Sequence, residues 1–156
     1  MQSLLKPLLG MVLAAGIAGT AQAQSPSPFA KPEDAIKYRQ SALFVMGQHF
    51  GRIGAVVKGE QSYNKDEVAK NAAIAEQMSS LHWEAFAAGT DKGNTRAKPE
   101  IWSNPAKFKS AAEAMEREMS KLAAVAKGGE LNAIKAQFGE TGKACKACHD
   151  DFRKKE

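Results

Sequence analysis

Five residues near the C-terminal end of the chain, Cys145-Lys146-Ala147-Cys148-His149, constrain the fold more than any other feature. Residues three apart lie on one face of a helix, so both thiols point the same way with an imidazole beside them. This spacing is the pattern of covalent haem c attachment, in which the thiols bond the two haem vinyl groups and the histidine ligates the iron. The chain is therefore expected to fold around one flat group held by Cys145, Cys148 and His149.

Three other uses of two close cysteines fit the sequence less well. A zinc site needs four ligands, but the chain has two cysteines, and its other histidines, His49 and His82, lie far upstream. A thioredoxin-like redox pair needs a strand and a βαβ context that this alanine-rich chain does not supply. A disulfide between residues three apart on a helix would be strained and would close a very small loop. Haem attachment is the best supported interpretation.

The N-terminus has the features of an export signal, which haem attachment outside the bacterial cytoplasm requires. Lys6 precedes an apolar run, and Ala21-Gln22-Ala23 fits a signal-peptidase site. The run is too short for a membrane-spanning helix. We therefore predict a signal peptide over residues 1–23, cleaved after Ala23, and a flexible segment over 24–31. The mature chain would be periplasmic with no membrane anchor; an uncleaved anchor is the alternative.

The charge of the mature chain is modest. Removal of residues 1–23 deletes Lys6 and no acidic residue, so the formal net charge falls from +5 to +4. The chain has no arginine-rich stripe with interleaved aromatic residues, which argues against nucleic acid as a partner. The basic tail Arg153-Lys154-Lys155 is interpreted as a helix end, where cations complement the helix dipole. A mature chain of about 130 residues is one domain that can bury a core without a disulfide.

Apolar residues recur at helical spacing in four stretches, and no stretch has the alternation of a strand. The expected helices cover about 32–58, 66–81, 104–127 and 130 onward. Asn104-Pro105 predicts the start of the third helix, and Gly128-Gly129 its end. The residues expected to face inward are Ile36, Leu43, Met46, Phe50, Ile53 and Val57 in the first helix, Val68, Ala72, Ala75 and Met78 in the second, Phe108, Ala112, Met115, Met119, Leu122 and Val125 in the third, and Leu131, Ile134, Phe138, Cys145, Cys148 and Phe152 in the fourth.

These helices, with short turns at two of the three connections, predict an all-α fold: an antiparallel four-helix bundle over residues 32–156 with one covalent haem c near one end. The third connection, 82–103, contains glycines, a proline and mixed charges, and long loops of this kind often carry function or close over a site. Gly139 and Gly142 interrupt the last helix before the motif. A close approach to the macrocycle and a slight kink explain these glycines equally well.

Two polar residues interrupt the apolar stripe of the first helix. Arg39 and Gln40 stand where Met46-Gly47 and Ile53-Gly54 recur in later heptads. Inward polar groups need partners, and a guanidinium matches a carboxylate in charge and geometry, so we expect Arg39 to bind a haem propionate. The alternative is that Arg39 extends to solvent at the rim of the bundle.

Leu43 lies one turn beyond Arg39 on the same face of the first helix. If Arg39 binds a propionate, Leu43 lies over the porphyrin, where an aliphatic side chain cannot ligate iron. The sixth iron position would then be vacant but sterically covered. Met46 is the competing candidate, because its thioether would give a six-coordinate, low-spin iron with a raised potential. A methionine on a helical core stripe is more often a packing residue.

The sequence resembles the cytochrome c′ family. The resemblance rests on the C-terminal CxxCH, on residues 31–43, on Phe50-Gly51-Arg52 and on Pro99-Glu100-Ile101-Trp102, and it covers essentially the whole mature chain. The family folds as a four-helix bundle, so the predicted fold rests on the resemblance as well as on periodicity. The roles that the resemblance implies are thioether attachment for Cys145 and Cys148, proximal ligation for His149, distal cover for Leu43, haem-edge contacts for Arg39 and Gln40, and a basic neighbour of the imidazole for Arg153.

The resemblance further implies a periplasmic, five-coordinate, high-spin haem that binds nitric oxide and carbon monoxide, discriminates against dioxygen and passes single electrons to periplasmic redox partners. An apolar distal side offers no hydrogen-bond donor to polar bound dioxygen, whereas nitric oxide binds without one. A homodimer through the first helix is also implied, to which Phe44 could contribute. An enzymatic role such as peroxidase is disfavoured, because Leu43 cannot act as a distal acid or base and His49 is expected to face solvent.

Overall fold

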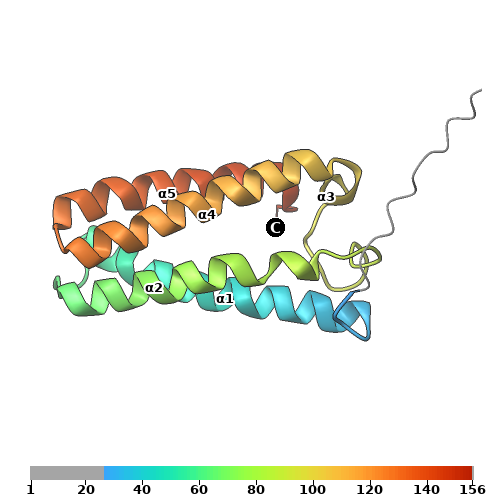
Figure 1. The fold of residues 1–156 in the computed structure, drawn as a ribbon, viewed down its shortest axis with the longest axis horizontal. Helices are drawn as coiled ribbons and strands as arrows, with labels where there is room; N and C mark the ends of the chain where they lie inside the picture. The colour runs from blue at the N-terminus through green and yellow to red at the C-terminus, as the bar shows by residue number, and fades with distance from the viewer. Residues whose placement is uncertain (1–26, 156) are drawn as a thin grey trace, which may run out of the picture.

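A computed structural model describes residues 27–155 (Figure 1). The predicted signal peptide, its cleavage site after Ala23 and the first part of the predicted flexible segment lie outside these residues. Just before the first helix, the ring of Phe29 lies 5.1 Å from that of Tyr38. Within the described range, every helix is too short or too polar to cross a membrane.

Four long helices and two short ones make up the described part of the chain. They are α1 (Pro32–Val57), α2 (Lys65–Leu81), the 3-10 helix η1 (Trp83–Ala85), α3 (Glu100–Ser103), α4 (Pro105–Gly128) and α5 (Leu131–Phe152). The four long helices agree with the predicted ranges to within one or two residues. The two short helices lie in the connection that the sequence pattern indicated only as a loop.

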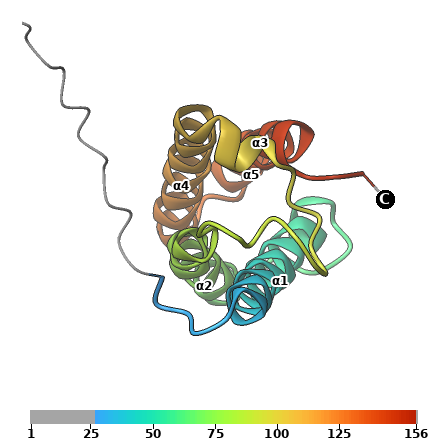
Figure 2. The ribbon, with the colours of Figure 1, turned by 90° about the vertical axis from the view of Figure 1, so that its right-hand side faces the viewer.

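The long helices form the predicted antiparallel bundle. α1 packs beside α2, α2 beside α4, and α4 beside α5, whereas α1 and α5 share a smaller contact. The end that carries the α1–α2 and α4–α5 turns is called the turn end below, and the end that carries residues 82–104 is called the loop end (Figure 1). Viewed from the loop end, the chain between α2 and α3 crosses the mouth of the bundle (Figure 2).

Local sequence signals set several helix ends. The Asn104 side chain accepts a hydrogen bond from the backbone N–H of Lys107, as an N-cap residue does, and Pro105 follows in the first turn of α4. Gly129 ends α4 in the left-handed conformation, with φ of +85°, and its N–H donates to the carbonyl of Val125. Both predicted ends of this helix are thereby confirmed.

The core is aliphatic and methionine-rich toward the turn end. Its buried members are Ile53, Val68, Ala72, Ala75, Met115, Met119, Leu122, Ala126 and Ile134. The seam between α1 and α5 is closed by Phe50 stacked on Phe138, with ring centroids 4.2 Å apart. Gly54 permits this approach, because a Cβ there would lie 3.0 Å from the Phe138 ring. Leu43, expected to face inward, is half-buried.

Candidate haem site

The haem-attachment motif lies in the last two turns of α5. Cys145, Cys148 and His149 are all half-buried, and both cysteines are free thiols. Burial raises the pKa of Cys145, and burial together with the nearby charges of Cys145 and Asp151 raises the pKa of Cys148 to about 11.

His149 is held beside a basic hollow at the surface. Arg153, one turn later, places Nη1 3.5 Å from Nε2 of the imidazole. Burial, followed by the charges of Arg153 and Arg96, lowers the pKa of His149, so the ring is neutral at neutral pH, which is the form that ligates metals. The hollow has a volume of about 300 Å³; its lining residues are Arg96, His149, Asp150, Arg153, Lys154 and Lys155. The structure thus brings Arg153 and His149 together.

A short backbone ladder follows α5 directly. The N–H of Lys98 donates to the carbonyl of Phe152 at 3.0 Å, and the N–H of Lys154 donates to the carbonyl of Arg96 at 2.8 Å. Ala97 and Arg153 form the antiparallel bridge between these two bonds. The loop end is therefore joined to the chain immediately after the predicted iron ligand.

The register between α1 and α5 brings Leu43 to the same level along the bundle as the motif. The two helices run antiparallel, and Phe50 stacks on Phe138. Seven residues toward the loop end from this pair lie Leu43 on α1 and Cys145 on α5, and seven helical residues span about 10 Å. Met46 lies one turn nearer to the turn end and packs against the aliphatic core.

Arg39 is buried, with 2% of its surface exposed, so the alternative that it extends to solvent is wrong. Nη1 donates to the carbonyl of Ala85 at 2.9 Å and to the Thr90 hydroxyl at 2.7 Å, and Nη2 donates to the Thr90 carbonyl at 2.7 Å and to the Thr95 hydroxyl at 2.8 Å. The guanidinium carbon also lies 4.6 Å from the centre of the Phe86 ring. Burial lowers the pKa of Arg39 to about 10, so the charge persists at neutral pH. Arg39 thus holds the loop with both terminal nitrogens.

Two further polar residues of α1 differ from expectation. Gln40 is exposed rather than inward, and its Nε2 donates to the carbonyl of Asn94 at 2.8 Å, so it also holds the loop. His49 was expected to face solvent, which is wrong, since the ring is half-buried and its Nδ1 lies 2.7 Å from Oδ1 of Asn71 on α2. Because Nδ2 of Asn71 donates to the carbonyl of Glu67, Oδ1 accepts from the imidazole N–H.

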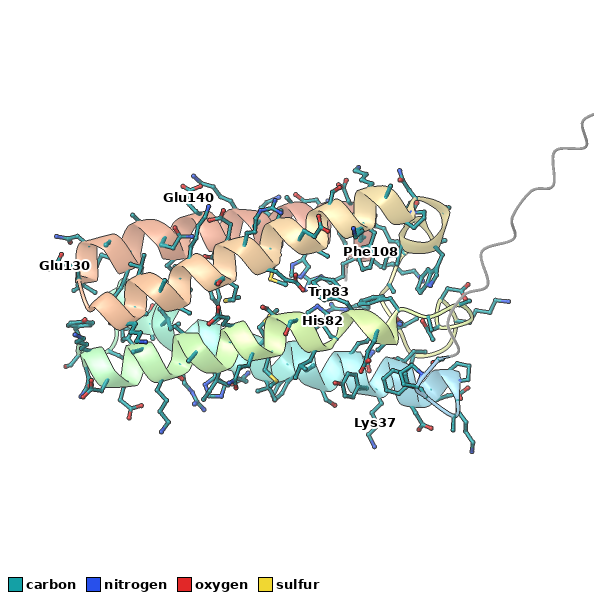
Figure 3. All side chains as sticks on the ribbon, in the orientation of Figure 1. Lys37, His82, Trp83, Phe108, Glu130 and Glu140 are labelled. Atoms are coloured by element: carbon teal, nitrogen blue, oxygen red, sulfur yellow. The ribbon has the colours of Figure 1, made fainter. Side chains whose placement is uncertain are left out.

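An aromatic cluster that the sequence patterns did not identify lies inside the loop end. Trp83 packs on His82 with ring centroids 3.9 Å apart and meets Phe108 of α4 edge-on at 5.6 Å. Phe108 in turn meets Phe152 of α5 edge-on at 5.2 Å. Figure 3 shows His82 and Trp83 directed into the space between α2 and α4. One feature of the sequence could have predicted this cluster. Both tryptophans of the chain, Trp83 and Trp102, fall in the connection between α2 and α4.

His82 is a buried, neutral member of this cluster. Only 1% of its surface is exposed, and Nδ1 lies 3.1 Å from the carbonyl of Met78. Burial lowers its pKa to about 4, while the backbone hydrogen bond opposes part of that shift.

The two glycines of α5 before the motif, Gly139 and Gly142, have no other described atoms within contact distance of an added Cβ.

These residues fit a flat, largely apolar group with carboxylate substituents. Two thiols and an imidazole on one helix face supply the haem c donor set. The aromatic side chains of Trp83, Phe108 and Phe152 line the interior at the loop end, beside the motif. The indole nitrogen of Trp83 is buried without a partner among the described residues, which is an unmet demand for an acceptor.

Comparison with known proteins also indicates a protein that binds haem c. A family model described as Cytochrome C′ matches residues 34–153. Cytochrome c′ of Alcaligenes xylosoxydans xylosoxydans is 48% identical over 128 residues, which are 82% of this chain and 99% of the relative. Cytochrome c′ of Rubrivivax gelatinosus is 47% identical over 128 residues, which are 81% of this chain and 99% of the relative.

Solved structures agree in fold. The crystal structure of the Rubrivivax gelatinosus protein aligns with a TM-score of 0.78 and 46% identity, covering 81% of this chain and 99% of that one. A nitric oxide complex of a cytochrome c prime variant from Alcaligenes xylosoxidans aligns with a TM-score of 0.78 and 48% identity, covering 82% and 99%. A carbon monoxide-bound variant of the same protein aligns with a TM-score of 0.77 and 48% identity, covering 81% and 99%. The chain belongs to the cytochrome c′ family of haem c proteins.

Proposed function

We propose that this chain binds nitric oxide and carbon monoxide at a five-coordinate, high-spin haem c and can pass single electrons. Cys145 and Cys148 hold the haem covalently, and His149 is the single protein ligand of the iron. The haem supplies the gas-binding and redox chemistry. The protein supplies the covalent anchor, one neutral imidazole and an apolar interior.

The distal assignment rests on the register of α1 against α5. Leu43 lies level with Cys145 and presents a branched alkyl side chain that neither ligates iron nor donates a hydrogen bond. Such a side lowers the affinity for polar bound dioxygen more than that for nitric oxide, and it leaves the sixth position sterically covered. This register is the observation that carries the proposal.

The alternative is a six-coordinate, low-spin electron carrier with Met46 as distal ligand. Met46 is partly buried and packs against the aliphatic core, about one turn away from the level of Leu43. Those contacts favour packing over ligation. Arg39 and Gln40 remain proposed haem-edge residues, although both already bind the loop, and Arg153 remains the proposed basic neighbour of the ligated imidazole.

Visible spectra of the purified holoprotein distinguish the two functions. We expect high-spin spectra in both oxidation states that change on addition of nitric oxide or carbon monoxide. Leu43→Ala should raise the association rate of carbon monoxide at least tenfold, because the steric cover is removed. Met46→Ala should leave the spectrum unchanged, and Leu81→Ala, at an exposed position of α2, is the matched control. A low-spin spectrum that Met46→Ala converts to high-spin would overturn the distal assignment.

Electron transfer has its own support in the basic hollow beside His149. Arg153, Lys154 and Lys155 surround the edge of α5 that carries the iron ligand, a surface that favours an acidic redox partner. Lys154→Glu with Lys155→Glu should slow reduction by an anionic flavin and remove its salt dependence. Lys37→Glu, on the outer face of α1, should change neither (Figure 3). Equal effects of the two substitutions would refute a local docking surface.

A homodimer through α1 is proposed from its outward face. Phe44 is 66% exposed, an unusual state for a phenylalanine, and Val45 beside it is 36% exposed. Gly47 and Gly51 follow, with open space around each. The helix has no side chains at these two positions, so another helix could pack close to its backbone. Phe44→Glu should convert the dimer to a monomer in light scattering, whereas Leu81→Glu, at another exposed apolar position, should not.

The proposed location is the periplasm, reached by cleavage after Ala23. Intact-mass measurement of the periplasmic fraction should find a chain that begins at Gln24 and carries one haem. A haem-bearing chain that retains residues 1–23 would contradict cleavage.

No catalytic role is proposed for this chain. The one histidine of α1, His49, is hydrogen-bonded to Asn71, and the Leu43 side chain cannot donate or accept a proton.

A further inference from the structure

Trp83 carries the one buried side-chain polar atom of the described residues that has no hydrogen-bond partner, its indole Nε1. Trp102 differs, because its Nε1 lies 2.9 Å from the carbonyl of Phe86 and 3.1 Å from that of Ala87. An unmade hydrogen bond at a buried donor costs about 1–3 kcal/mol, and few are left in folded proteins. The Trp83 N–H therefore indicates an acceptor that the polypeptide does not supply.

The position of Trp83 connects this donor to the haem site. Trp83 follows α2 directly, and Phe108 and Phe152 link its ring by successive edge-on contacts to the end of α5. Trp83 and Cys145 also pack against the same core cluster. The side chain points into the bundle between α2 and α4 (Figure 3). The unpaired N–H is thus in the same interior as the haem-binding face of α5.

The chemistry of haem c restricts what the acceptor can be. The pyrrole nitrogens hold iron and the thioether sulfurs are weak acceptors, so the two propionate carboxylates are the strong acceptors of the group. A bound gas would satisfy the indole only while bound, whereas a carboxylate is present in every state. We propose that the indole N–H of Trp83 donates a hydrogen bond to a haem propionate. The proposal rests on haem c binding and not on the gas-binding function.

Trp83 thereby becomes a positioning residue. The thioethers fix the vinyl edge of the macrocycle to α5, and the indole fixes the propionate edge to the chain that follows α2. Trp83 is an additional partner beside the haem-edge role proposed for Arg39, whose terminal nitrogens also bind the loop.

Resonance Raman spectra of the holoprotein test the proposal through the propionate-bending band. Trp83→Phe keeps an aromatic ring and removes the N–H, so this band should shift. Trp102→Phe removes an N–H that has protein acceptors, so the band should stay in place. An unchanged band in Trp83→Phe, or equal shifts in both variants, overturns the proposal. Coordination-marker bands in the same spectra report the number of iron ligands, so failure of the five-coordinate proposal is seen separately.

A second measurement applies if Trp83→Phe does not fold. In Trp102→Phe holoprotein, Trp83 is the sole tryptophan. Ultraviolet resonance Raman should show a strongly hydrogen-bonded indole N–H, and a free N–H overturns the proposal. Carbon monoxide provides a third readout: if Trp83→Phe shifts the C–O stretch and leaves the propionate band in place, the indole faces the gas and the propionate assignment is wrong.

Discussion

The two ends of the bundle bury their interiors in different ways. Toward the turn end, Ile53, Leu122 and Ile134 form an aliphatic core whose members need no polar partner. Inside the loop end lie a charged Arg39, a neutral His82 and an unpaired Trp83 nitrogen. The turn end is complete as a polypeptide, whereas the loop end has a donor left over. This difference indicates which half maintains the fold and which half is built around the haem.

Leu122→Ala is the strongest test of the turn end. Leu122 has no exposed surface, so its truncation should leave a cavity and lower the free energy of unfolding by about 4 kcal/mol. Chemical denaturation of the holoprotein measures this change. The visible spectrum of the folded variant should be that of the wild type. Leu81→Ala, at a position 42% exposed, is the control and should cost less than about 1 kcal/mol. A changed haem spectrum in Leu122→Ala would contradict the separation of the two ends.

Arg39→Met tests whether the loop end depends on polar tethers. The substitution keeps an apolar stem and removes four hydrogen bonds to residues 85, 90 and 95 of the loop. The free energy of unfolding should fall by about 3 kcal/mol, because the buried acceptors lose charged donors. Amide exchange in residues 85–95 should accelerate more than exchange in α4. Gln40→Met, which loses one exposed bond, should cost under about 1 kcal/mol; equal costs would refute the tether role of Arg39.

The pH dependence of stability tests the burial of His82. Its pKa is lowered from 6.5 to about 4, so the unfolded chain takes up a proton first as the pH falls. The contribution of neutral His82 is thus fully present above pH 6.5 and is lost as the pH drops toward 4. We expect a loss of about 3 kcal/mol across this window. His82→Gln should flatten the profile and His49→Gln should not; a profile insensitive to His82→Gln would contradict a buried neutral ring.

Gly129→Ala is the smallest test and addresses the α4–α5 turn. Gly129 has φ of +85°, which side chains with a Cβ rarely adopt, and the added Cβ would meet the aliphatic chain of Lys65. A loss of about 1 kcal/mol is expected in thermal or chemical unfolding. Gly128→Ala, with open space at a helical position, should instead gain up to about 1 kcal/mol. The same change in both variants would remove the conformational explanation.

The sequence predicted those parts of the molecule that depend on local rules. Apolar periodicity located the four long helices, Asn104-Pro105 and Gly129 marked the ends of α4, and CxxCH identified the cofactor anchor. Helix propensity, capping and covalent spacing all act within a few residues, so one sequence is enough to recognise them.

The parts that escaped prediction depend on contacts between distant residues. Arg39 was recognised as inward, but its partners Thr90 and Thr95 lie more than one element away in an irregular loop. His49 pairs with Asn71 across two helices, and neither residue has a local signal for the other. Trp83 was not assigned a role because its neighbours Phe108 and Phe152 come together only when α2, α4 and α5 pack.

The ladder between residues 96–98 and 152–154 has a consequence for the histidine just before it. The last turn of a helix ordinarily frays, and a side chain there samples several positions. Here the Phe152 carbonyl and the Lys154 N–H are paired with the loop, so the turn that contains His149 is held from its C-terminal side. The imidazole is thereby preorganised by the polypeptide itself. The pairing lowers the conformational entropy of that turn in the folded protein, so the His149 side chain samples fewer orientations.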